Sequence, residues 1–216
     1  MQHPSHVDLV FPVRGQTLAK DHGYALYGAL SRALPALHGA GWLAVQPIPG
    51  HLRPPETLDL GGRSQLRLRI PVEQIAQVLP LTGAALDVAG AHLELGPPAV
   101  HQLRPAAVLD AHLVVIKLTG GPGKPFDRQA FEARFLAEAQ RQLARLEVIG
   151  TPQLCGRGRI SVGGRRVIGY AVRVSNLSPE HSLALQAHGI GGKRTMGCGF
   201  FRPSRWKQAI ALEPAA

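Results

Sequence analysis

A dense run of glycine and basic residues occupies Gly189–Phe201, with the sequence GIGGKRTMGCGFF. Glycine permits positive φ and close approach of the backbone, so successive N–H groups can face one anion. The neighbouring pair Lys193 and Arg194 would add long-range attraction to a phosphate. The alternative is a glycine-rich turn between a helix and a strand. The run is neither GxxxxGK[ST] nor a GxGxxG after a strand, so a nucleotide-binding fingerprint is not supported.

Ten histidines supply groups that can move a proton near neutral pH. No HxxxH or HxH pair with acidic neighbours occurs, and Cys155 and Cys198 have no CxxC partner. The sequence therefore predicts no metal site, no disulfide framework and no cofactor. No GxSxG motif is present, so acyl transfer by a serine nucleophile is not indicated.

The net positive charge comes from one half of the chain. The 216 residues carry 24 Lys and Arg against 14 Asp and Glu, a formal net charge of +10. Residues 1–100 hold equal numbers of basic and acidic side chains, so the whole excess belongs to residues 101–216. Such an asymmetric excess favours a polyanionic partner, with nucleic acid as the first candidate. No apolar run is long enough for a membrane span and no signal peptide is evident, so a cytoplasmic protein without membrane association is expected.

Periodicity predicts the elements of the first half. The expected strands are residues 7–13, 42–48, 65–70 and 91–95, where apolar residues run together or alternate. Leucines at 26, 30, 34 and 37 form one apolar stripe of a helix that Asp21 could cap and that Pro35 ends or kinks. A second short helix is expected over residues 72–79.

The second half repeats this plan. Strands are expected at residues 111–118, 157–162, 165–174 and 200–212, and a loop at residues 120–125. Gly163–Gly164 between the middle two strands predicts a hairpin. Asp127 and Ser178 are placed to cap helices over residues 127–146 and 179–187. Each half thus follows β-α-β-β-α-β, and the predicted fold is α+β with two tandem ferredoxin-like (RRM-like) domains, residues 1–103 and 104–216.

Two stretches resemble the Cas6 family of CRISPR RNA-processing endoribonucleases. Gly189-Ile190-Gly191, the basic pair and Gly197-Cys198-Gly199 are similar to the glycine-rich loop near the end of that family's chains. His22–Leu30, followed by residues 35–38 (PALH), is similar to the family's first helix and the histidine behind it. Residues 50–155 carry little of the likeness. The resemblance implies tandem ferredoxin-like domains and metal-independent cleavage of precursor RNA within CRISPR repeats.

In that chemistry the 2′-hydroxyl attacks the phosphorus, and the products carry a 2′,3′-cyclic phosphate and a 5′-hydroxyl. The resemblance implies His38 as the catalytic histidine, with His22 as a second candidate. A straight helix from His22 to His38 would separate these two histidines by roughly 24 Å, at about 1.5 Å per residue. Both can therefore serve one phosphate only if the segment through Gly23 is not helical and folds back beside the helix. The position where some relatives have a helix tyrosine is Ser31 here, which does not favour a tyrosine-assisted variant.

The expected partner is CRISPR repeat RNA, as precursor and as mature crRNA, with other subunits of a CRISPR effector complex as further candidates. The predicted RNA contacts lie in the glycine-rich run and on the hairpin: Gly189, Gly191, Lys193, Arg194, Gly197, Gly199, Arg157, Arg159, Arg165 and Arg166. Contacts to an A-form stem would follow shape and phosphates more than sequence. The competing hypothesis is a non-catalytic RNA-binding subunit of a CRISPR ribonucleoprotein on the same fold.

Overall fold

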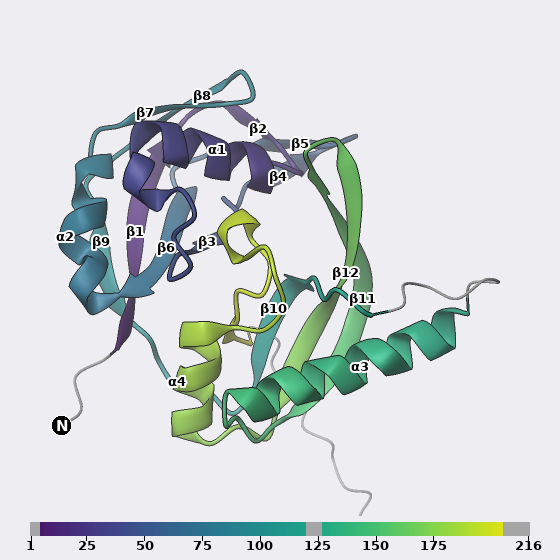
Figure 1. Cartoon of the computed structure of the whole chain (residues 1–216). Helices are drawn as coiled ribbons and strands as arrows, with labels where there is room; N and C mark the ends of the chain where they lie inside the picture. Colours follow the sequence, from purple (N-terminus) through teal and green to yellow (C-terminus); the bar gives the residue numbers. More distant parts are fainter. Residues whose placement is uncertain (1–4, 120–126, 205–216) are drawn as a thin grey trace, which may run out of the picture.

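The strands form two main sheets, one from each half of the chain (Figure 1). The computed structural model describes residues 5–119 and 127–204. The first half contains β1 (His6–Arg14), β2 (Thr17–Ala19), α1 (Gly23–Ala33), η1 (Pro35–Leu37), β3 (Ala44–Gln46), β4 (His51–Arg53), β5 (Thr57–Asp59), β6 (Gln65–Pro71), η2 (Val72–Gln74), α2 (Ile75–Val78), η3 (Leu79–Leu81), β7 (Ala85–Val88), β8 (Ala91–Leu95) and β9 (Ala99–Gln102). The second half contains β10 (Leu109–Val114), α3 (Arg128–Arg145), β11 (Thr151–Val162), β12 (Arg165–Ser175), α4 (Pro179–His188), η4 (Arg194–Met196) and β13 (Arg202–Pro203).

The first sheet has the strand order β3-β6-β1-β8-β7, with β9 also paired to β1. Its pairings are antiparallel, and the sequence of β1, α1, β3, β6, α2 and β8 is that of a ferredoxin-like domain. Alternation along β1 sends Leu9 and Phe11 into the apolar core, while Asp8 lies on the opposite face. On β6, Leu68 joins the same core, and Arg69 pairs with Asp8 across the strands.

The second sheet has the order β11-β12-β10-β13, which is the same ferredoxin-like order. A separate core joins this sheet to α3 and α4, with Phe135, Leu143, Tyr170 and Leu185 among its buried members. The prediction of two tandem ferredoxin-like domains is therefore confirmed. The chain passes from the first sheet to the second between β9 and β10; the domain boundary at residues 103 and 104 stays a prediction.

Several local predictions are confirmed by contacts that satisfy backbone groups. The Asp127 carboxylate accepts a hydrogen bond from the amide of Ala130 at the start of α3. Ser178 accepts one from the amide of His181 at the start of α4. The hairpin turn between β11 and β12 is made by Gly163 and Gly164, both with positive φ.

Other local predictions were wrong or too simple. Asp21 does not cap α1, because its carboxylate instead accepts a hydrogen bond from the Ser161 amide, 2.7 Å away in the hairpin. The strand expected at residues 42–48 is only Ala44–Gln46, and residues 72–79 hold three short helical turns in place of one helix. The small sheet β2-β5-β4 was not predicted. The expected loop at residues 120–125, and residues 205–212 of the expected last strand, lie outside the described residues.

Contacts between the two halves involve the segment that connects α4 to β13. η4 packs against α1 and β3, so the glycine-rich run lies between the first and second halves (Figure 1). Cys198 of this run is buried in a small apolar cluster with Leu113, Val115 and Ile160, and Met196 packs against the same cluster. Within the described parts of the chain, no helix is long and apolar enough to cross a membrane.

Candidate RNA interface and active site

The glycines of Gly189–Phe201, here named the glycine-rich loop, are required by close backbone packing. A Cβ placed on Gly189 would lie 2.3 Å from the carbonyl oxygen of Gly199, and one on Gly199 would lie 2.3 Å from that of Ile190. Gly197 is pressed against Pro47, which follows β3. Gly189, Gly197 and Gly199 also have positive φ, which side-chain-bearing residues rarely adopt. The loop is therefore a compact, preformed structure fitted against the first half.

All five glycine amides of the loop donate hydrogen bonds to acceptors within the protein. The Gly191 amide donates to the Gln142 side chain, the Gly192 amide to Val115, and the Gly199 amide to Leu113. Gly189 and Gly197 donate to carbonyls at the end of α4 and in η4. The expectation that these N–H groups converge on a phosphate is therefore wrong, since protein acceptors already satisfy them. What the loop presents outward is Lys193 at its tip.

Lys193 and Arg194 differ in how they are held. Lys193 is exposed and sits in the left-handed region with φ +65°. The Arg194 guanidinium turns inward, where Nη2 donates to the Ala187 carbonyl at 2.7 Å and Nε is buried without a partner among the described residues. Burial, together with the nearby charge of Arg69, lowers the pKa of Arg194 to about 10. Lys193 is thus the more available cation of the pair.

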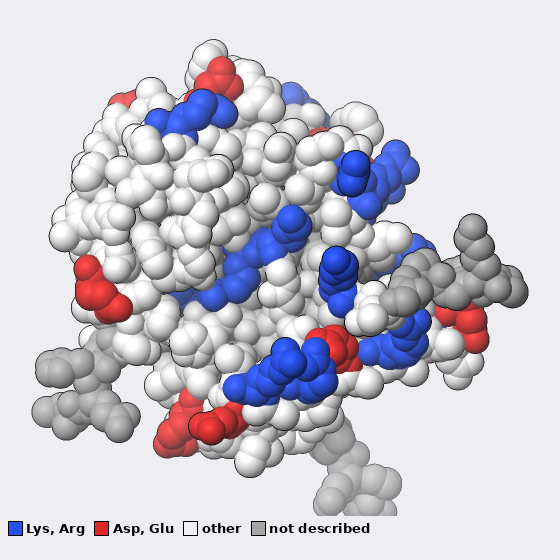
Figure 2. Space-filling view, in the orientation of Figure 1, with Lys and Arg blue, Asp and Glu red and all other residues white. Residues whose placement is uncertain are grey.

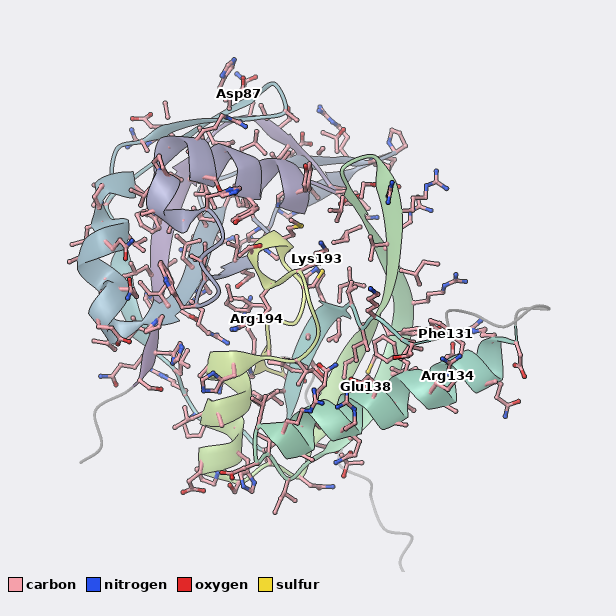
Figure 3. The ribbon with its side chains drawn as sticks, viewed as in Figure 1. Asp87, Phe131, Arg134, Glu138, Lys193 and Arg194 are labelled. Carbon is pink, nitrogen blue, oxygen red and sulfur yellow. The ribbon has the colours of Figure 1, made fainter. Side chains whose placement is uncertain are left out.

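Basic side chains form a band across the face that contains the loop. Figure 2 shows Lys and Arg running through the middle of this face, where Figure 3 labels Lys193 and Arg194, between α1 and α4. Further basic side chains lie over the β11–β12 hairpin at the side of the same view. The acidic side chains visible in this view lie outside the central band.

Strand register divides the hairpin arginines into two groups. Arg157, Arg159, Arg165 and Arg166 are all exposed. Arg159 lies opposite Ile168, and Arg166 opposite Ser161, so Arg157, Arg159 and Arg166 share one face of the hairpin. Arg165 lies opposite Val162, on the face that packs toward the glycine-rich loop. Of the four arginines predicted to contact RNA, three therefore face away from the glycine-rich loop, and Arg165 alone is on the face toward it.

His22 is buried, and both of its ring nitrogens bind backbone groups. Nδ1 lies 2.8 Å from the carbonyl of Ala19, and Nε2 accepts a hydrogen bond from the amide of Ile48 at 3.0 Å. These partners require a neutral ring with its proton on Nδ1. Burial lowers the pKa of His22 and favours the same state. The geometry argues against His22 as a catalytic residue, because neither nitrogen is free to exchange a proton with a substrate.

His38 is exposed and directly follows η1. Its ring lies parallel to that of Tyr27 on α1, with centroids 6.3 Å apart. The Tyr27 hydroxyl accepts a hydrogen bond from the Gly39 amide at 2.8 Å, which fixes the backbone next to His38. Tyr27 could not be singled out from the sequence, because its contact with residue 39 depends on the turn after the helix.

The helix α1 begins directly after His22, and His38 follows the short turn η1 behind the helix. It begins at Gly23, so the segment through this glycine does not fold back, and its 11 residues span about 16 Å. Gly23 is in contact with Met196 of the glycine-rich loop, where a Cβ would lie 2.2 Å from the Met196 carbonyl oxygen. The segment through Gly23 therefore lacks the conformation that a phosphate shared by His22 and His38 was expected to need, and both ring nitrogens of His22 are already bound to backbone groups.

A pocket of about 530 Å³ lies on the open face of the second sheet, between that sheet and the end of β3. Its wall includes His112 and Arg173 from the sheet, Pro47 after β3 and Phe200 of the loop. The His112 ring reaches solvent at this wall but is otherwise enclosed by protein, and this desolvation lowers its pKa. No motif in the sequence marks His112, because only the fold places it beside the loop. Among the described residues, no group of three or more His, Cys, Asp or Glu side chains could hold a metal ion.

The fold and this site define a tandem ferredoxin-like protein with a basic, glycine-rich loop between its two halves. The family model described as Cas6 Crispr matches residues 7–206. The CRISPR-associated endonuclease Cas6 of Myxococcus xanthus (strain DK1622) is 43% identical over 197 residues, which cover 91% of this chain and 81% of that protein. The chain therefore belongs to the Cas6 family and is a CRISPR-associated endonuclease.

Solved structures agree with this fold. A CRISPR-associated protein Cas6 superposes with a TM-score of 0.67 at 10% identity, covering 93% of this chain and 99% of that one. The product of a Cas6-related gene from Pyrococcus furiosus gives a TM-score of 0.63 at 13% identity, covering 94% and 99%. An RAMP protein binding different RNA substrates gives 0.61 at 12% identity, covering 92% and 98%. At these identities the likeness supports the fold alone.

Proposed function

We propose that this protein cleaves CRISPR precursor RNA within its repeats, without a metal ion, and so generates crRNA. The 2′-hydroxyl upstream of the scissile bond attacks the phosphorus, the P–O5′ bond breaks, and a 2′,3′-cyclic phosphate remains. The proton leaves the 2′-oxygen and another is taken up by the departing 5′-oxygen. The observation that carries the proposal is the membership of the Cas6 family, with 43% identity to an endonuclease over most of the chain.

His38 is the residue we assign to proton transfer. It is exposed, and Tyr27 orients it from α1, so its imidazole can reach a bound strand. A positioned acid or base of this kind contributes about 10²–10⁴-fold to a rate. His22 directly precedes this helix, where it joins residues 19 and 48 through backbone hydrogen bonds. We therefore give His22 a structural role.

The basic surface is the part we assign to RNA. Lys193 at the tip of the loop, together with Arg194 behind it, supplies positive charge between the two halves. The exposed hairpin arginines extend this charge along the second half. Phosphate contacts of this kind provide affinity and position the strand without reading its sequence.

Cleavage of labelled repeat RNA in EDTA tests the catalytic assignment. We expect His38→Ala to lower the single-turnover rate about 10²–10⁴-fold while the Kd for uncleavable 2′-deoxy RNA stays within about threefold. His51→Ala, which removes another exposed histidine of the first half, serves as the control and should cleave like the wild type. Repeat binding without cutting by the wild-type protein would instead favour a non-catalytic RNA-binding subunit. A product without a cyclic phosphate would contradict the proposed attack.

A further inference from the structure

Arg69 is a fully buried arginine on the face of the first sheet opposite its apolar core. Its side chain is 2% exposed, and it lies on β6 opposite Asp8 of β1. Nε donates to Asp8 Oδ1 at 2.8 Å and Nη2 donates to Asp8 Oδ2 at 3.1 Å. This two-point contact with a carboxylate fixes the plane and direction of the guanidinium.

The remaining donors of Arg69 cross to the second half of the chain. Nη1 donates to the carbonyl of Gln186 at 2.8 Å and to that of Phe201 at 2.7 Å. The guanidinium carbon also lies 4.2 Å from the ring centroid of Phe200. Gln186 is in the last turn of α4, just before the glycine-rich loop, and Phe200 and Phe201 close the loop. One side chain of the first half therefore binds both ends of the loop.

Stability alone does not account for a charge at this position. Burying an ion pair costs desolvation energy that its own attraction often only offsets, and an apolar pair of similar size can be as stable. Here the cost is increased by Arg194, whose charge lies close enough to Arg69 for the two to affect each other. An apolar residue would also leave the carbonyls of Gln186 and Phe201 without this donor, and it could not fix their separation.

We propose that Arg69 is a positioning residue for cleavage. It holds the two ends of the glycine-rich loop at a fixed place against the first sheet, and so sets where the basic tip lies relative to the helix that precedes His38. This inference rests on the proposed function, since it concerns the reaction assigned to that site. Misplacement of a reacting group by about 1 Å can cost about 10²-fold in rate, so a loosened loop should slow cleavage. Affinity should change less, because phosphate contacts are spread over the hairpin as well.

Arg69→Lys tests this, because lysine keeps the charge near Asp8 but cannot bind the carboxylate and both carbonyls at once. We expect the single-turnover cleavage rate to fall about 10–100-fold, while the Kd for uncleavable repeat RNA changes less than about threefold. Hydrogen exchange of the amides of residues 189–201 should become faster in the protein without RNA. The matched control is Arg67→Met, which removes a second partner of Asp8 on the same strand. It should leave the rate and the loop exchange as in the wild type.

The exchange measurement separates this inference from the proposed function. If the wild type fails to cut repeat RNA, the proposed function fails, yet faster loop exchange in Arg69→Lys would still support the anchoring role. Unchanged loop exchange, or equal losses of rate and affinity, would overturn the inference. If Arg69→Lys does not fold, Asp8→Asn takes its place, because it keeps the guanidinium but removes the charge that directs it. The same fall in cleavage rate without a matching loss of affinity, and the same faster loop exchange, are then expected. If neither is observed, the inference about Arg69 is overturned.

Discussion

The ring of His22 joins two backbone segments that are distant in sequence, and this makes the stability of the first half dependent on pH. Its pKa in the folded protein lies below the usual 6.5, chiefly because burial removes water from the ring. The unfolded chain therefore binds the proton more tightly. The stability from neutral His22 is complete above pH 6.5 and is lost as the pH falls below that value. The slope for one histidine reaches at most about 1.4 kcal/mol per pH unit.

We predict that His22→Gln will lower the free energy of unfolding at pH 8 but will weaken its dependence on pH between 7 and 5. Urea unfolding followed at several pH values measures both effects. Other histidines with lowered pKa, among them His6 and His188, contribute to the slope in both proteins, so the difference between the two curves is the quantity of interest. Parallel curves would show that His22 is not held neutral by the fold.

For individual residues, the sequence indicated which side chains could do chemistry but not which of them were free to contact a substrate. Placing His22 before a helix followed from local spacing, whereas its bond to Ile48 joins residues 26 positions apart and has no local signal. The same holds for Asp21, which was expected at a helix cap and instead binds the hairpin amide of Ser161. Which donors and acceptors remain for a substrate depends on such distant partners.

Among the elements, the glycine-rich loop owes its shape to packing as much as to flexibility. We predict that Gly199→Ala will destabilise the protein by at least about 1–3 kcal/mol, because φ is +62° and the added Cβ would lie 2.3 Å from the Ile190 carbonyl oxygen. Gly192→Ala is the matched control in the same loop, since its φ is not positive and a Cβ there meets nothing within 4 Å. Urea unfolding of the two variants makes the comparison.

Equal stabilities of these two variants would mean that the loop is not packed as described. The expected contrast also separates two explanations of a glycine-rich sequence. A purely flexible loop would tolerate alanine similarly at both positions, whereas a packed loop accepts it only where space exists. The sequence alone could not make this distinction, because both cases have the same composition.

Elements with strong local signals were the predictable ones. The helices that begin after Asp127 and Ser178 have capping residues, and the turn at Gly163–Gly164 has glycines where positive φ is needed. Strands β2 and β4 have only three residues each and exist because they pair with β5 across more distant sequence. Such short strands carry too little alternation to be read from the sequence. The ferredoxin-like order followed from the longer elements.

Charge is a property of the whole molecule, and it predicts how binding depends on salt. The first 100 residues are electrically balanced, so the positive field arises from the second half. Each phosphate neutralised by a basic side chain contributes about 0.7–0.9 to the slope of log K against log salt. We predict that replacing Arg157 and Arg159 together by alanine will reduce the magnitude of this slope by up to about 2 for repeat RNA, because both are exposed on one face of the hairpin.

The control is a variant with Arg14 and Arg63 replaced by alanine, which removes the same charge from exposed positions of the balanced half. If the hairpin contacts phosphates directly, only the first variant changes the slope, as measured by filter binding of uncleavable RNA over a range of salt concentrations. If the RNA responds only to total charge, both variants weaken binding alike. That result would exclude the hairpin from the RNA interface. The glycine-rich loop, which Arg69 of the first half binds, would then be the part of the second half that contacts the RNA strand.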